Sequence, residues 1–118
     1  MTVTAGRIYE STPPGTLRVL VDRLWPRGIS REAAPWDLWL KEGAPSTGLR
    51  RWYHANPQSI AEFHRRYRQE LAMPEPLLAV ERLAALAREQ PVALLTASRE
   101  VSHSQVPVLK EAVLARLA

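Results

Sequence analysis

The chain has 118 residues, 46% of them hydrophobic, and this length and composition suit a single domain around one hydrophobic core. It contains no cysteine, which excludes disulfides, a thiolate nucleophile and a cysteine-ligated zinc site. Sixteen Lys and Arg against twelve Asp and Glu give a formal net charge of +4, so the surface should prefer anionic partners.

The first residues of the chain, MTVTAGRIYE, do not resemble a targeting segment, because no basic stretch is followed by an apolar run. Apolar runs elsewhere are only a few residues long, too short to span a membrane. We therefore expect a cytoplasmic protein without a membrane segment.

Three segments in the first half of the chain predict strands. Residues 7–10 are a short β-prone run, and residues 11–16, dense in turn formers, follow them. Residues 17–24 are nearly continuously apolar with a β-branched centre, which favours a central strand covered on both faces. Residues 36–41 fit either a helical stripe or a short edge strand, and the breakers on each side favour the strand.

The segment between the last two of these strands contains several breakers. The central strand should end at Pro26, because proline has no N–H for the sheet ladder, and Gly28 permits a sharp change of direction. Ser30 is placed to cap a short helical turn, which Pro35 would end.

The middle of the chain predicts three helices. The first opens at residues 45–47. Asn56 as the cap and Pro57 at the first helical position start the second, over residues 57–71. Residues 77–88 carry a broad apolar face among good helix formers, which gives the third.

A second buried strand and a last helix complete the pattern. Residues 92–96 are apolar until their last position, as in a buried strand. The last helix is capped either by Ser102, which forms a capping-box pattern with Gln105, or by Ser104, which better avoids placing Pro107 inside the second turn. Strands joined through helices run parallel. The sequence therefore predicts a single α/β domain over residues 1–118, with a small, mostly parallel sheet covered by about four to five helices.

Polar residues follow the two buried strands, at the point where each strand ends. In parallel α/β sheets, ligands bind in the crevice beyond the carboxyl ends of the strands. The positive end of the last helix also lies there, so the crevice should hold a phosphate, sulfate or carboxylate. The expected ligand-binding residues are Arg23, Trp25, Arg27, Thr96, Ser98 and Arg99. The candidates for acid–base catalysis are Asp22 and His103.

Simpler interpretations of these residues stay open. Asp22 paired with Arg23 or Arg27 is also consistent with an ion pair that braces the fold. His103 is also consistent with a residue that merely starts a helix. The three histidines form no pair at metal-ligand spacing and no nucleotide-binding glycine loop is present, so we expect neither a metal nor a cofactor. Whether a reaction is catalysed stays open.

Two other functions stand beside the small anionic ligand. Arginines on and before the helix over residues 57–71 suggest a nucleic-acid-binding module, because clustered cations contact phosphates. These arginines are Arg50, Arg51, Arg65, Arg66 and Arg68. The third hypothesis is a protein-interaction domain, which the sequence neither supports nor excludes, and the oligomeric state is open.

Residues 18–28, RVLVDRLWPRG, resemble the signature of the family called domain of unknown function 488, in its YeaO-like branch. Similar blocks follow over nearly the whole chain, at Lys41, Ala44-Pro45-Ser46, Leu49-Arg50, Trp52, His54, Phe63, Arg65-Arg66-Tyr67 and Glu70-Leu71. The resemblance implies a small α/β fold and bacterial or archaeal cytosolic proteins without an assigned activity. In the last block Arg99 and His103 match the family, whereas Thr96 and Ser98 depart from it. The cysteine that some branches place there has no counterpart.

Overall fold

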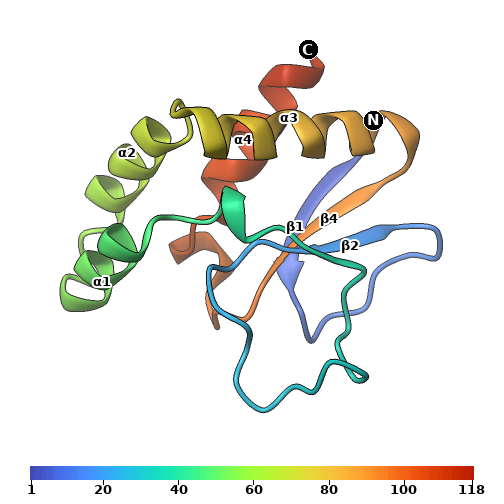
Figure 1. Ribbon diagram of the computed structural model, residues 1–118, viewed down its shortest axis with the longest axis horizontal. Helices are drawn as coiled ribbons and strands as arrows, with labels where there is room; N and C mark the ends of the chain where they lie inside the picture. The colour runs from blue at the N-terminus through green and yellow to red at the C-terminus, as the bar shows by residue number, and fades with distance from the viewer.

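The strand β4 (Val92–Thr96) forms the centre of the sheet, and all five of its residues are buried. The computed structural model describes all 118 residues (Figure 1). Two strands, β1 (Val3–Arg7) and β2 (Leu17–Leu20), pair with β4 on either side, and β3 (Leu38–Trp39) pairs with β2. The sheet is therefore entirely parallel, in the order β1-β4-β2-β3.

Four α-helices and two short 3-10 helices complete the fold. They are η1 (Lys41–Gly43), α1 (Thr47–Ala55), α2 (Ile60–Glu70), α3 (Pro74–Glu89), η2 (Val101–His103) and α4 (Val106–Leu117). Figure 1 shows α3 and α4 together over one face of the sheet, and α1 and α2 side by side at the left of the view. The expected α/β class with a parallel sheet is confirmed. None of the helices combines the length and the apolar composition that crossing a bilayer requires.

The two faces of the sheet are covered in different ways. On one face Val19, Val92 and Leu94 pack into the main core with the apolar sides of α3 and α4. On the other face Leu20, Ala93 and Leu95 join a smaller core that Ile29, Trp36 and Trp39 cover. The second cover thus comes from the irregular segment over residues 23–37 together with Trp39 of β3, and not from a layer of helices.

Three of the expected strands have different bounds in the structure, and the strand expected over residues 36–41 is only the two-residue β3. The first strand spans Val3–Arg7 and not residues 7–10, which form a turn in which Glu10 Oε1 accepts the Arg7 N–H at 2.7 Å. The prediction was wrong because β1 is weakly apolar and forms a strand by pairing with β4. The central strand ends at Leu20 and not at residue 24, because Arg23 turns away to bind carbonyls of the segment before α1.

The starts of several helices also differ from the prediction. After Ser30 a single turn forms at residues 32–33, and the Ser30 hydroxyl accepts the Ala33 N–H at 3.2 Å, as expected of a cap, but no helix continues from it. Helix α2 begins at Ile60 and not at residue 57, because the Asn56 carbonyl accepts the Ser59 N–H in a separate turn. Helix α3 begins already at Pro74, since prolines fit the first turn, where the N–H groups have no helical partner.

The segment that leads into α1 is fixed by contacts from α2 and α3. The buried Tyr67 hydroxyl donates to the Gly43 carbonyl, and burial raises the pKa of Tyr67, so it stays a donor. A Cβ atom at Gly43 would lie only 3.3 Å from the Cβ of Ala79. The Ser46 N–H donates to Glu70 Oε1 at 2.8 Å, and the Ser46 hydroxyl caps α1. These contacts set the position of α1 relative to the sheet.

Replacing Tyr67→Phe should lower the free energy of unfolding by about 1–3 kcal/mol, because the buried Gly43 carbonyl loses its donor. Urea unfolding followed by circular dichroism measures this change. Tyr9→Phe is the matched control, since Tyr9 is 61% exposed and the loss of its hydroxyl should be neutral. Equal unfolding midpoints for the two variants would contradict the anchoring role of Tyr67.

Candidate functional site

A pocket of about 350 Å³ opens at the carboxyl ends of β2 and β4. Residues 22–27 form the wall after β2, and residues 97–98 and 103–105 form the wall after β4. The remaining lining comes from Pro45, Arg50, Tyr53 and His54, before and on α1, and from Phe63 of α2. The pocket therefore lies at the sheet edge where parallel α/β folds bind their ligands.

The carboxylate of Asp22 joins the two strand ends at the floor of this pocket. Its Oδ2 accepts the Ala97 N–H at 2.9 Å, and its Oδ1 accepts from Gln105 Nε2 at 2.9 Å. The buried Gln105 side chain also donates to the Val21 carbonyl at 2.9 Å. No ion pair of the structure includes Asp22, so the carboxylate braces the fold through neutral donors and not through an arginine.

Two other residues of the β2 wall also carry structural contacts. Arg23 donates from Nε to the Pro45 carbonyl at 3.2 Å and from Nη2 to the Ala44 carbonyl at 3.1 Å. Trp25 donates from Nε1 to the Ile29 carbonyl at 2.6 Å, and its ring meets those of Trp36 and Trp39 edge to face. Both side chains hold the pocket wall in place while lining it.

The guanidinium groups of Arg27 and Arg50 line the pocket without a protein partner. Neither takes part in a side-chain hydrogen bond or in any of the ion pairs of the structure. Arg27 is exposed on the loop after β2, and Arg50 is half-buried on α1. These two arginines are the cations of the pocket most available to a ligand.

The α1 wall was only partly anticipated from the sequence. Arg50, Tyr53 and His54 follow the i, i+3, i+4 spacing of one helix side, and all three line the pocket. Arg50 was grouped with Arg51 as a nucleic-acid contact, but the helix turns Arg51 away from the pocket and into solvent. The spacing was available in the sequence, yet it overlaps an apolar stripe that predicted burial.

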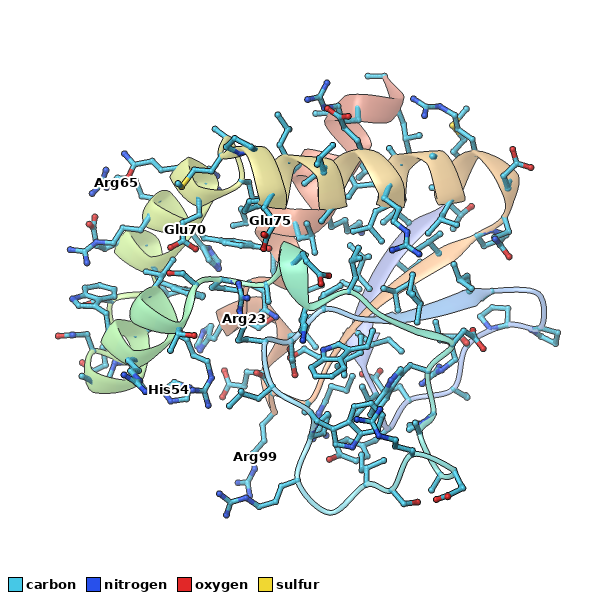
Figure 2. All side chains as sticks on the ribbon, in the orientation of Figure 1. Arg23, His54, Arg65, Glu70, Glu75 and Arg99 are labelled. Carbon is cyan, nitrogen blue, oxygen red and sulfur yellow. The ribbon has the colours of Figure 1, made fainter.

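The β4 wall contains some of the expected residues and not others. Ser98 and His103 line the pocket, whereas Thr96 and Arg99 do not. Thr96 is buried, and its hydroxyl accepts the Ser98 N–H at 3.1 Å. Arg99 is exposed, and Figure 2 shows it extending outward, away from Arg23 and His54. Of the expected arginines, Arg23 and Arg27 therefore lie at the pocket, and Arg99 lies outside it.

His103 makes one contact through its imidazole and one through its main-chain carbonyl. Its Nδ1 lies 2.9 Å from Glu100 Oε2, and its carbonyl accepts the Tyr53 hydroxyl at 2.8 Å. Burial and the negative charge of Glu100 raise the pKa of Tyr53, so its hydroxyl stays a donor. The Tyr53 contact ties α1 to the segment between β4 and α4.

The start of α4 offers fewer free N–H groups than the sequence suggests. The Val106 N–H donates to the Ser104 hydroxyl at 3.2 Å, and Pro107 has no N–H. The Ser104 carbonyl in turn lies 2.8 Å from His64 Nε2 of α2. The positive charge of the pocket therefore comes from side chains more than from this helix end.

The arginines of α2 are largely engaged by carboxylates. Arg65 and Arg66 both contact Glu62 at 2.7 Å, and hydrogen bonds from them lower the pKa of Glu62 to about 2. Arg66 also lies 4.1 Å from the ring centre of Trp52, and Arg68 lies 3.7 Å from Glu111. The net positive charge of this face of α2 is therefore smaller than the count of its arginines implies.

Replacing Asp22→Asn should lower the free energy of unfolding by about 1–3 kcal/mol. An asparagine has one acceptor oxygen, whereas the Ala97 N–H and Gln105 Nε2 both donate to Asp22. Asp37→Asn is the matched control, because Asp37 accepts a single N–H, from Arg18 at 2.8 Å, which an amide oxygen can replace. Urea unfolding compares the two variants, and an unchanged midpoint for Asp22→Asn would rule out the bracing role.

A family model described as the Inactive DUF488-N3 subclade matches residues 2–118. The uncharacterized protein Rv3073c of Mycobacterium tuberculosis is 39% identical over 110 residues, which are 92% of this chain and 91% of that protein. The uncharacterized protein YeaO of Escherichia coli is 37% identical over 112 residues, 94% of this chain and 96% of that protein. No solved structure matches significantly. The family resemblance of the sequence is thereby confirmed, and the chain belongs to the DUF488 family, within the subclade described as inactive.

Proposed function

We propose that this protein binds a small anionic ligand in the pocket at the carboxyl ends of β2 and β4. The observation that carries the proposal is that Arg27 and Arg50, from two different elements, line the pocket without a protein partner. The planar fork of a guanidinium group binds the oxygens of phosphate, sulfate or carboxylate in pairs. Two such groups at one pocket favour an oxyanion as the occupant.

The acidic content of the pocket supports the same proposal. Asp22 is the one carboxylate that lines it, and both of its oxygens already accept hydrogen bonds. A bound anion is therefore repelled by only one negative charge, and hydrogen bonds from the protein already stabilise that charge. The volume of about 350 Å³ lies at the lower end of the range for small-molecule sites.

Binding has more support than catalysis in this pocket. Asp22 is engaged in bracing the strand ends, and His103 Nδ1 lies against Glu100, so neither is poised as a free acid or base. The description of the subclade as inactive agrees with a binding role. Acid–base chemistry by Asp22 and His103 stays a prediction.

Phosphate or sulfate should raise the melting temperature of the protein relative to chloride at equal ionic strength. At ten times the dissociation constant, one bound anion adds about 1.4 kcal/mol to the free energy of unfolding. This corresponds to roughly 5 °C for a domain of this size. Arg27→Ala and Arg50→Ala should each remove most of the shift, because each deletes one of the unpartnered cations.

The controls are Arg51→Ala and Arg99→Ala, which remove exposed cations that do not line the pocket and should keep the full shift. Phosphate and sulfate also stabilise proteins by exclusion from their surface, an effect that does not depend on one arginine. Equal shifts in all four variants would therefore assign the stabilisation to exclusion and contradict the pocket.

Nucleic-acid binding through α2 has less support, because Arg65, Arg66 and Arg68 already contact carboxylates. We expect the double variant Arg65→Ala, Arg66→Ala to bind a labelled DNA duplex no more weakly than the unchanged chain. Fluorescence anisotropy at several salt concentrations measures this. A loss of affinity of roughly tenfold or more, with a shallower salt dependence, would favour the nucleic-acid hypothesis instead.

A further inference from the structure

The charge of the pocket indicates how many negative charges its occupant carries, provided that the proposed anion binding holds. Three arginines line it, Arg23, Arg27 and Arg50, against the one carboxylate of Asp22. With the histidines neutral, these side chains leave a net charge of +2. A dianion neutralises this charge, whereas a carboxylate or a sulfate ester, each carrying one negative charge, does not. A phosphate monoester carries about −1.5 to −2 at neutral pH.

The apolar part of the pocket indicates that the occupant also has an organic part. Leu24 lies between two of the pocket arginines in the sequence and is 54% exposed, which leaves much of its side chain free. Other apolar residues of the lining are already covered. Phe63 is buried and stacks on Tyr53, and the ring of Trp25 is covered by two tryptophans and by Arg31. Leu24 is therefore the apolar side chain with the most surface to offer a ligand.

Leu24 differs from the other large exposed hydrophobic residues by its position. Met1, Tyr9, Met73, Leu78 and Leu114 are also exposed, but none of them lines the pocket. Burying the free part of a leucine against an organic group strengthens binding by about fivefold. The organic part of a phosphate ester can make this contact with Leu24, whereas inorganic phosphate cannot.

We propose that the pocket is specific for a phosphate monoester, with Arg27 and Arg50 binding the phosphate and Leu24 contacting the organic part. Leu24 is then a specificity-determining residue, because it separates esters from inorganic phosphate. The proposal deepens the anion-binding function and depends on it.

Isothermal titration calorimetry with inorganic phosphate, phenyl phosphate, phenyl sulfate and benzoate tests the proposal. Phenyl phosphate should bind roughly tenfold more tightly than phenyl sulfate or benzoate, because it has the second negative charge. It should bind about fivefold more tightly than inorganic phosphate, because its ring packs on Leu24. Leu24→Ala should remove this second advantage and leave the affinity for inorganic phosphate unchanged.

The matched control is Leu78→Ala, on α3, which is 66% exposed and lies outside the pocket, and it should change no affinity. If inorganic phosphate binds as tightly as phenyl phosphate, or Leu24→Ala leaves their ratio unchanged, the role of Leu24 is overturned while anion binding stands. Equal affinities for phenyl phosphate and phenyl sulfate would overturn the preference of the pocket for a dianion. If no probe binds, the anion-binding function itself fails, and this inference with it.

Discussion

Three parts of the chain that are far apart in sequence meet at the carboxylate of Asp22. The residue lies two positions after β2, accepts the N–H of Ala97 just after β4, and accepts from Gln105 at the start of α4. The two donors bind different oxygens of the carboxylate, and an amide would present an NH2 group to one of them in place of an acceptor. The pocket exists because these contacts hold the two strand ends and the helix start in register, with α1 added as a further wall through Tyr53.

The sequence predicts well those elements that are determined by local composition. The strand over residues 92–96 was predicted correctly, because a short apolar run between Pro91 and a polar loop favours a buried strand. β1 was misplaced, because Val3–Arg7 is weakly apolar and gains its structure from pairing with β4. The short turn after Ser30 was also expected, because a capping serine followed by Pro35 leaves room for one turn only, and the Ser30 hydroxyl does accept the Ala33 N–H.

The crevice after β2 and β4 was predictable from topology, since the carboxyl ends of parallel strands share one edge. The expected residues that do line the pocket are Asp22, Arg23, Trp25, Arg27, Ser98 and His103. The contribution of α1 to the pocket was not predictable. The position of α1 depends on the contacts that Tyr67 and Glu70 make with the segment before it. Rotation about that helix axis decides that Arg50 and not Arg51 lines the pocket. Such rotations follow from packing, so the spacing of Arg50, Tyr53 and His54 does not by itself show which side of the helix faces the pocket.

The two cores of the protein are separated by the sheet. One consists of helix side chains packed on Val19, Val92 and Leu94, and the other consists of Ile8, Leu20, Ala93 and Leu95, covered by Ile29, Trp36 and Trp39. Substitutions in one layer therefore need no compensating change in the other. Changes among Ile29, Trp36 and Trp39 can therefore reshape the wall after β2 while the packing of α3 and α4 on the opposite face stays as it is.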